Sequence, residues 1–448
     1  MSGVDASWLH MDAPTNRMQI VGVLSTATPI DNDRLVSILS DRLVGRYPRF
    51  AHRIVDRDSA RPAWVPIANF DIADQLRHET LAAPGDARAL EARIDALLPE
   101  ALPHDRAPWC VHIVDGYQGG TALIVRIHHC VADGMALARV LVDLTDDAPE
   151  TDVPRLPTPP KARAGLQERL ALAIETGRSV VQDTLELATH PDRLMESAQT
   201  GARGLSEVAH LLAMPVDPDT ALCRPLGTKK TCAWGPPISV AEVKRLGKVR
   251  GCTINDVLVA TMAGALRRVL LAVDGAAPSI RAVIPIDVRN PRKDLSSELG
   301  NAFSLVFLDL PLDEADRLGR LRRVHERMLA LKDGVQVGLI YGVLRAAGHA
   351  PTKVEELLVD HLGERATLVM TNVPGPRHHR FLAGVRLDDI RFLVPVSGRL
   401  GLGVSILSYA GRVTMGVAGD VAVLGDPHRF TRAFSDEYAA LKRDLGVR

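Results

Sequence analysis

The sequence predicts an α/β protein organised in two domains, and three observations lead to this fold class. At 448 residues the chain is longer than one ordinary hydrophobic core accommodates. Apolar runs typical of strands alternate with amphipathic segments typical of helices, both before residue 150 and after residue 231. The stretch between these two regions is rich in proline at its start, which is typical of a connection between domains.

The first predicted domain covers residues 1–150. Residues 18–24 (MQIVGVL) are mostly apolar and predict a buried strand, and residues 122–127 (ALIVRI) predict another. Residues 32–44 and 87–98 carry apolar side chains at helical spacing. The domain is completed by a strand predicted over 111–114 and a helix predicted over 135–144.

Residues 151–230 are predicted to form a linker and a helical crossover. Repeated prolines in residues 148–162 exclude regular elements there, because proline has no N–H to donate. Residues 165–214 then carry Leu and Val at helical spacing. We expect this face to pack on a core, and a lipid-facing surface is the alternative.

The second predicted domain covers residues 231–448. Two apolar runs flank the Ala410-Gly411 turn, at 402–409 and 412–418, and this arrangement predicts a β-hairpin. The other expected strands are 280–286, 303–310 and 367–372, and the expected helices are 239–249, 254–271, 313–332 and 427–445.

Composition excludes several classes of protein. Lys plus Arg count 54 and Asp plus Glu also count 54, so the chain has no net positive charge to attract nucleic acid. Aromatic residues are only 4% of the chain, which leaves few side chains for stacking on bases. We therefore expect no nucleic-acid partner. The five cysteines are widely spread and include no Cys-x-x-Cys pair, so neither a disulfide framework nor a metal site is expected.

The sequence also lacks the usual membrane signals. It starts without the pattern of a signal peptide, and we find no uninterrupted apolar run of about 18 residues or more. We expect a cytoplasmic protein whose contact with a membrane or lipid droplet would be peripheral.

The segment 128–134 (HHCVADG) is the strongest candidate for a site. It places His128 and His129 at the end of a predicted strand, followed by Asp133, Gly134 and a helix. A histidine titrates near pH 6.5, so at neutral pH it can accept a proton from a hydroxyl group and return it later. We expect Gly134 to let the chain turn sharply into the helix.

Other interpretations of this segment stay open at the level of the residues. A histidine pair at a strand end is on its own more often a packing feature than a site. Adjacent strand residues face opposite ways and rarely ligate one metal ion. The neighbouring Cys130 could be a nucleophile paired with histidine. The second pair, His378-His379, is interpreted as a surface loop.

The motif and several later segments resemble one family. His128-His129-x-x-x-Asp133-Gly134 resembles the signature of the chloramphenicol acetyltransferase-like superfamily. The later landmarks resemble those of its bacterial wax ester synthase/acyl-CoA:diacylglycerol acyltransferase branch, in the same order over nearly the whole chain. These landmarks are Asn255-Asp256, residues 285–289 (PIDVR), Leu299-Gly300-Asn301, residues 371–376 (TNVPGP) and the C-terminal hairpin.

The resemblance implies a fold and an activity. The fold would be two chloramphenicol acetyltransferase-like domains, each a mixed sheet flanked by helices, with the active site in a tunnel at their interface. The activity would be transfer of an acyl group from acyl-CoA, as co-substrate and without a cofactor, to diacylglycerol or a long-chain alcohol. The products would be triacylglycerol or wax esters.

The resemblance also assigns roles to residues. His129 would be the general base, and His128, Gly134 and Asp256 would support the motif. Asp133 would be structural, pairing with an arginine for which Arg289 is one candidate. Asn255 would stabilise an oxyanion or order the histidine loop, and a helix N-cap is the alternative for this residue.

Two motifs depart from the family pattern and leave alternative functions open. Pro-Leu-Trp is replaced by Ala107-Pro108-Trp109, and Pro-Met-His-Val by residues 17–20 (RMQI). One alternative is an O-acyltransferase of the same superfamily that acts on another acceptor. The other is a non-catalytic lipid-binding homologue.

Overall fold

Two mixed β-sheets carry the fold of the computed structural model, which describes residues 1–59, 61–149, 214–288, 299–332, 361–396 and 398–447. Met1–Pro154 and Pro215–Arg448 form one compact unit. Most of the predicted linker and crossover (151–230) lies outside the described residues. Among the described residues, no helix is long and apolar enough to cross a bilayer.

The first sheet contains β1 (Gln19–Ser25) as an inner strand that is buried along nearly its whole length. β1 is antiparallel to β6 (Gly120–His128) and to β14 (Asp389–Leu393), whereas β4 (Leu76–Thr80) runs parallel to β5 (Trp109–Tyr117). The strand order in the described chain is β14-β1-β6-β5-β4.

The second sheet is the larger one. Its parallel pairs are β11 with β15 and β11 with β9, and the other pairs are antiparallel. The order in the described chain is β10-β9-β11-β15-β16-β7, and β8 also pairs with β16. The strands are β7 (Lys230–Trp234), β8 (Ile238–Ser239), β9 (Ile280–Asp287), β10 (Phe303–Leu310), β11 (Leu368–Pro374), β15 (Leu402–Tyr409) and β16 (Arg412–Asp420).

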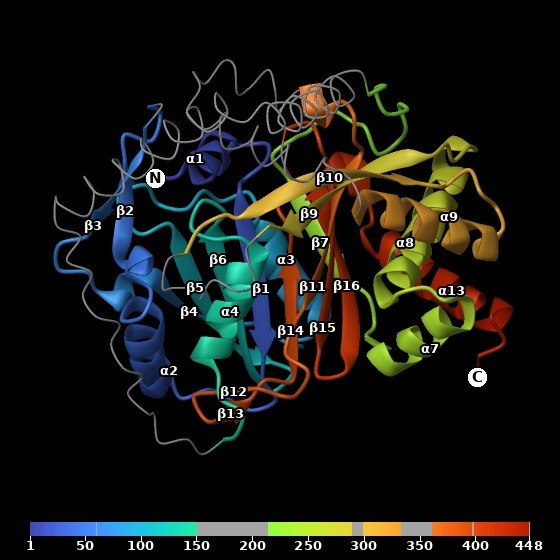
Figure 1. The fold of residues 1–448 in the computed structure, drawn as a ribbon. Helices are drawn as coiled ribbons and strands as arrows, with labels where there is room; N and C mark the ends of the chain where they lie inside the picture. The colour runs from blue at the N-terminus through green and yellow to red at the C-terminus, as the bar shows by residue number, and fades with distance from the viewer. Residues whose placement is uncertain (60, 150–213, 289–298, 333–360, 397, 448) are drawn as a thin grey trace, which may run out of the picture. The chain divides into compact units, whose positions relative to one another are not determined.

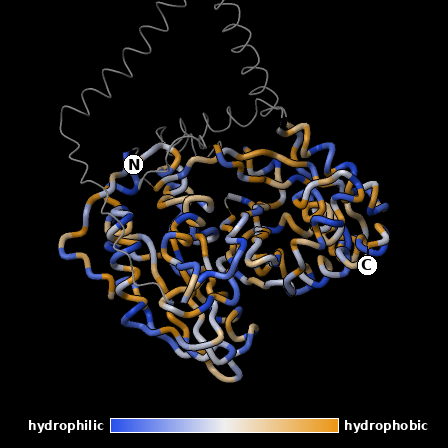
Figure 2. The backbone as a smooth tube through the Cα atoms, turned by 60° about the horizontal axis from the view of Figure 1, so that its bottom comes forward, coloured by the Kyte–Doolittle hydropathy of each residue, from blue (hydrophilic) through white to orange (hydrophobic). Residues whose placement is uncertain are grey.

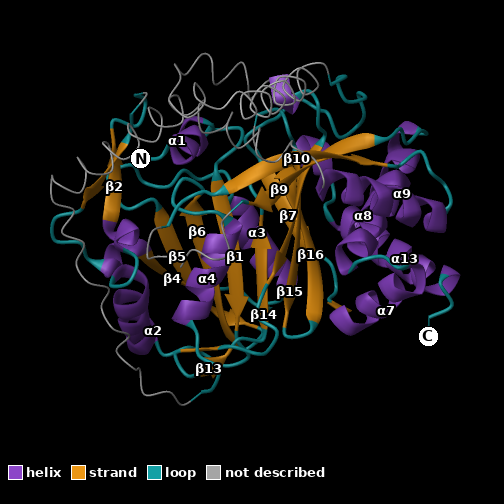
Figure 3. Ribbon diagram, in the orientation of Figure 1, coloured by secondary structure: helices purple, strands orange, loops and turns teal. Residues whose placement is uncertain are grey.

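Helices cover these sheets, and four of them, α7, α8, α9 and α13, gather beside the larger sheet (Figure 3). The helices are α1 (Gly3–His10), α2 (Asn32–Ile38), α3 (Ala87–Leu97), α4 (Gly134–Leu144), α7 (Val240–Arg250), α8 (Ile254–Asp274), α9 (Arg317–Lys332), α12 (Val421–Leu424) and α13 (His428–Asp444). Two small antiparallel ribbons pair β2 (His52–Val55) with β3 (Ala63–Pro66) and β12 (Phe381–Leu382) with β13 (Val385–Arg386). The expected α/β fold with mixed sheets and flanking helices is confirmed.

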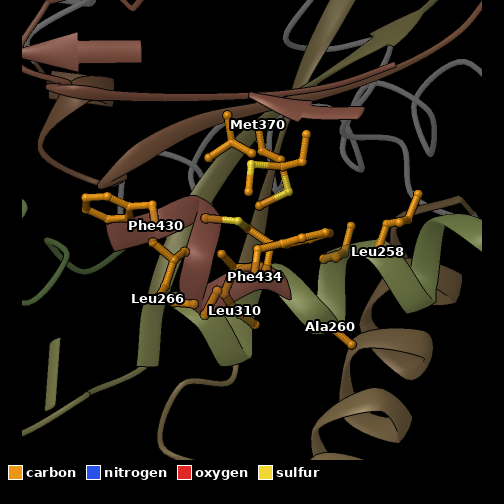
Figure 4. Close-up of a cluster of buried hydrophobic side chains, with 14 of the residues drawn as sticks. Leu258, Ala260, Leu266, Leu310, Met370, Phe430 and Phe434 are labelled. Carbon is orange, nitrogen blue, oxygen red and sulfur yellow. The ribbon is translucent and has the colours of Figure 1, made fainter. Parts of the chain in front are cut away.

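The core of the larger sheet is built around α8. Its N-terminus is a capping box, in which the Thr253 hydroxyl accepts the Asp256 N–H and the Asp256 carboxylate accepts the Thr253 N–H. The helix ends at Gly275, whose φ of 71° is the left-handed conformation that glycine adopts without strain. Between these ends, Leu258 and Leu266 belong to the same buried cluster as Phe430 and Phe434 of α13 (Figure 4).

The structure differs from the sequence predictions at several element ends. The helix expected over 32–44 is α-helical only to Ile38 and continues as π-helical turns over Leu39–Val44. The helix expected from 313 begins at Arg317, because the Asp316 carboxylate accepts the Gly319 N–H at 2.7 Å and caps it. Apolar and polar stretches are interleaved along the described chain (Figure 2), as expected for elements with one buried face.

Two elements cross between the regions predicted as separate domains. β14, from the C-terminal region, pairs with β1 and completes the first sheet (Figure 1). In return, α3 packs on β7 at the edge of the larger sheet. There, the Asp95 carboxylate accepts the Cys232 N–H at 2.7 Å and Glu91 accepts the Trp234 N–H at 3.1 Å. The predicted limits 1–150 and 231–448 remain a prediction.

We predict that Asp95→Ala destabilises the protein. The Cys232 N–H and the Thr231 hydroxyl would both lose their carboxylate partner, which costs about 1–3 kcal/mol of unfolding free energy. Urea unfolding followed by circular dichroism measures this. Arg88→Ala, on an exposed position of the same helix, should change the free energy by less than about 0.5 kcal/mol. Equal effects of the two substitutions would contradict the role of Asp95.

Candidate active site

The histidine segment forms the turn between β6 and α4. β6 ends at His128, and the next residue donates its N–H to the carbonyl of Met18 at 2.7 Å. The Cys130 N–H then donates to Nδ1 of His128 at 3.2 Å. These bonds direct the two histidine side chains into different surroundings, as expected for neighbours at a strand end.

His129 faces a cavity and is 7% exposed. Its ring stacks on Trp8 with 4.3 Å between centroids, and Phe303 lies at 5.6 Å. Its Nδ1 lies 3.0 Å from Oδ1 of Asn301. Burial lowers the pKa of His129, and the nearby Asp133 charge opposes this effect. The imidazole is therefore neutral at neutral pH and can accept a proton.

The side chains of His128 and Cys130 do not reach the cavity that His129 faces. His128 is fully enclosed, and burial, followed by the charge of Arg57, lowers its pKa to about 3. Burial raises the pKa of the Cys130 thiol, so this side chain stays protonated and is a poor nucleophile. Neither residue lines the cavity that His129 faces.

Asp133 holds the turn against the segment that precedes β10. Its Oδ1 accepts the N–H groups of Met135 and Ala136 and so caps α4. Its Oδ2 accepts the Ala302 N–H at 2.9 Å. The candidate partner Arg289 lies outside the described residues.

Gly134 does not act as we expected. It is the first residue of α4, and its φ is not in the left-handed region that requires glycine, so the turn does not depend on glycine's backbone freedom. Gly134 lines both the His129 cavity and a second cavity, and a Cβ built there would meet Val373 at 3.7 Å, an ordinary contact.

The His129 cavity measures about 210 Å³ and its wall is predominantly apolar. The second cavity measures about 160 Å³ and lies among β1, β5, β6, α2 and α4. Apart from Thr145 and Arg391, every side chain that lines the second cavity is apolar, or the residue is glycine. The two cavities share the lining residues Ile20, Gly134, Val373 and Phe392.

Asn255 lies beside the wall of the His129 cavity. Its Oδ1 accepts a hydrogen bond from Nδ2 of Asn372 at 2.9 Å, and Asn372 lines that cavity. Both asparagines line a third cavity of about 610 Å³, whereas only Asn372 lines the His129 cavity. The N-cap of α8 is Thr253, so the alternative of Asn255 as N-cap is wrong. This geometry favours loop ordering over oxyanion contact.

Asp256 belongs to the start of α8 rather than to the cavity. Its Oδ2 accepts hydrogen bonds from the Thr253 N–H at 2.8 Å and from Nδ1 of His325 at 2.7 Å. Cys252 lies close to both Asp256 and His325, with ligand-type atoms within 4.8 Å of one another. Because the Asp256 oxygen already accepts two hydrogen bonds, this trio is interpreted as a hydrogen-bonded helix start.

Sequence reasoning assigned no role to Asp5, Trp8 or Asn301, although all three lie around His129. Asp5 Oδ1 accepts from the backbone N–H and from Nδ2 of Asn301. The available signal for α1 was Ser2, whose hydroxyl caps the helix by accepting the Asp5 N–H. The contact between α1 and His129 joins residues far apart in the sequence, so no local sequence pattern predicts it.

Family models match most of the chain. Residues 1–258 match the wax ester synthase/diacylglycerol acyltransferase catalytic domain, and residues 299–442 match the C-terminal domain of the same family. A putative diacylglycerol O-acyltransferase of Mycobacterium tuberculosis is 26% identical over 470 residues, covering 100% of this chain and 96% of that one. A probable diacylglycerol O-acyltransferase of the same organism is 27% identical over 422 residues, with 92% and 88% covered.

Solved structures share the fold. The wax ester synthase/diacylglycerol acyltransferase of Marinobacter aquaeolei VT8 superposes with a TM-score of 0.69 at 20% identity, covering 99% of this chain and 98% of that one. The first condensation domain of the calcium-dependent antibiotic synthetase gives a TM-score of 0.63 at 17% identity, with 98% and 95% covered. At these identities the similarity concerns the fold.

We predict that Asp133→Asn lowers the free energy of unfolding by about 1–3 kcal/mol. Asparagine caps a helix as well as aspartate does, but its amide group would oppose the Ala302 N–H. Asp86→Asn is the matched control, because Asp86 caps α3 through one bond to the Ala89 N–H. It should change stability by less than about 0.5 kcal/mol. Urea unfolding of both variants compares them, and equal losses would rule out the Ala302 contribution.

Proposed function

The chain belongs to the wax ester synthase/diacylglycerol acyltransferase family and is an acyltransferase, and on this premise we propose that it esterifies diacylglycerol and long-chain alcohols with the acyl group of acyl-CoA. The products are triacylglycerol and wax esters. The observation that carries the proposal is a buried imidazole, that of His129, which lines a cavity with predominantly apolar walls.

His129 is the general base in this proposal. Its imidazole removes the proton of the acceptor hydroxyl, and the oxygen attacks the thioester carbonyl of acyl-CoA. The tetrahedral intermediate then expels the CoA thiolate, which takes the proton back from the imidazolium. Because no acyl-enzyme forms, both substrates must be bound together and the kinetics are sequential. Apolar walls favour acyl transfer, because they exclude water that would hydrolyse the thioester.

The remaining motif residues support this step without touching the reacting atoms. Asp133 fixes the turn through α4 and Ala302. His128 supports the backbone of the turn by accepting the Cys130 N–H, and Gly134 lies where the two cavities meet. Asn255 orders Asn372, and Asp256 stabilises the start of α8.

The second cavity supports a fatty chain as part of the substrate. A chain leaving the reacting carbon can pass Gly134 and Ile20 into a space with almost no polar lining. Burying each methylene group there contributes about 0.8 kcal/mol. This gain favours long-chain substrates over short ones.

A different acceptor is the second candidate, and the altered Pro-Leu-Trp and Pro-Met-His-Val positions favour it. Trp109, in the first of these, lines the second cavity, so the change adjoins the proposed chain site. A panel of sugar, polyketide and lipid alcohols separates the two functions. Hydroxyl-dependent CoA release would exclude a non-catalytic lipid-binding protein.

Peripheral contact with a membrane or lipid droplet is part of the proposal. Diacylglycerol and fatty alcohols reside in lipid phases, so the acceptor must come from one. Met135 and Val142 of α4 expose 40% and 41% of their surface, and Met135 also lines the His129 cavity. An apolar helix face beside the cavity suits entry from a lipid surface.

We predict that His129→Ala lowers the rate of CoA release about 10²- to 10⁴-fold. The assay uses palmitoyl-CoA with hexadecanol or with diacylglycerol. His78→Ala, an exposed histidine on β4, should retain the wild-type rate. Retained activity in His129→Ala would exclude its role as the base.

We predict that enlarging Gly22 shortens the preferred chain. Gly22 lines the second cavity, and a Cβ built there meets Val125 at an ordinary 3.9 Å, so larger side chains can extend into the space. Gly22→Leu should lower kcat/KM for palmitoyl-CoA or for hexadecanol by about 10-fold relative to eight-carbon analogues. Gly22→Ala, which adds one carbon, should have a smaller effect.

Two series of substrates, measured with the Gly22 variants, identify whether the acyl chain or the alcohol chain occupies the second cavity. One varies the acyl-CoA at fixed alcohol, and the other varies the alcohol at fixed acyl-CoA. Unchanged preference in both series would show that neither chain uses this cavity.

A further inference from the structure

We propose that Asn301, oriented by Asp5, is a positioning residue that keeps the proton of His129 on Nδ1 and leaves Nε2 as the atom that removes the substrate proton. The inference deepens the proposed function, because its kinetic consequence rests on His129 being the base. Its structural part, the location of the proton, can be measured independently.

The partners of the Asn301 side chain fix the orientation of its amide group. One of its terminal atoms lies 2.8 Å from Oδ1 of Asp5 and 2.8 Å from the backbone oxygen of His129. A carboxylate and a carbonyl oxygen can only accept hydrogen bonds. The atom between them is therefore the amide nitrogen, and the chemistry of its partners leaves no freedom to exchange it with the oxygen.

This orientation of Asn301 determines which ring nitrogen of His129 carries the hydrogen. The Asn301 oxygen must face the His129 ring, where it lies 3.0 Å from Nδ1. An amide oxygen only accepts, so Nδ1 must donate and must carry a hydrogen. Neutral imidazole has one N–H, and Nε2 therefore presents its lone pair. In the described part of the chain, no hydrogen bond occupies Nε2.

Burial and a contact with Arg49 fix the position of Asp5. It is 1% exposed, and Arg49 Nη1 lies 3.3 Å from its second oxygen. The same Arg49 nitrogen donates to the Val131 carbonyl at 3.0 Å, which ties this network to the turn after His129. Trp8, three residues beyond Asp5 on the same helix, stacks on the imidazole ring. Two residues of α1 therefore act on the His129 ring: Trp8 packs against its face, and Asp5 orients the Asn301 amide that accepts its proton.

The arrangement resembles the carboxylate that orients histidine in hydrolase triads, with one difference. Here a neutral amide separates the carboxylate from the imidazole. Asp5 can therefore select the tautomer without a direct ion pair. The proton acquired during the reaction then stays available for return to the leaving thiolate.

The experiment reads the proton directly. Full-length protein labelled with ¹⁵N-histidine is examined by NMR at neutral pH, and the His129 signals are identified by their loss in His129→Ala. The expected spectrum has a protonated Nδ1 and an unprotonated Nε2. A wild-type spectrum with the proton on Nε2 would overturn the proposal without any variant at this site.

The variant test uses Asn301→Leu, which has a similar size and no acceptor. In this variant the backbone carbonyl of His129 is the remaining acceptor beside the ring. A fraction of the His129 protons should therefore move from Nδ1 to Nε2, and kcat should fall about 10-fold with little change in KM. Asn16→Leu is the matched control, because buried Asn16 also donates two bonds to backbone carbonyls, those of Gly398 and Leu400. It should leave the His129 signals unchanged.

Asp5→Ala tests the carboxylate by itself. Partial movement of the proton supports the role of Asp5, and an unchanged spectrum in a folded variant would overturn that role. Unchanged signals in Asn301→Leu would overturn the role of Asn301. Absence of CoA release from wild-type protein would instead refute the proposed function, while the tautomer measurement would stand.

Discussion

The hydrogen bonds between the His129 turn and residues 300–302 are the contact on which the site depends. Asn301 binds the carbonyl and ring of His129, and Ala302 binds the Asp133 carboxylate. The histidine belongs to the first sheet, whereas residues 300–302 lead into β10 of the larger sheet. The cavity therefore has its working geometry only when both sheets are assembled.

The exchange of elements between the two sheets enforces this assembly. β14 pairs with β1 by main-chain bonds, and α3 satisfies N–H groups of β7 with the carboxylates of buried Glu91 and half-buried Asp95. The first sheet therefore takes a strand from the C-terminal region, and β7 of the larger sheet takes its N–H partners from the N-terminal region. Breaking the association would leave unpaired backbone groups on both sides, which are expensive in free energy. Because separating the two sheets is costly, they stay associated, and His129 keeps its position between them.

The elements that were predicted correctly are those in which apolar residues recur with the period of a strand or a helix. Long periodic segments such as β10 and β15 have the expected limits, and the His128-His129 segment lies between a strand and a helix as expected. α1 and β14 were missed, because eight and five residues carry little periodic signal and their partners are distant in sequence. Asp5 and Trp8 were missed for the same reason. The roles of His129, Asp133 and Asn255 remain proposals.

The carboxylates of α3 have a further consequence at the edge of the larger sheet. An open edge strand offers free N–H groups to any other strand, and this is a route to aggregation. On β7 the N–H groups of Cys232 and Trp234 are already engaged by Asp95 and Glu91. A second molecule cannot extend the sheet there without first displacing a helix. The same contacts that join the two halves thus also limit strand addition between copies of the protein in a crowded cell.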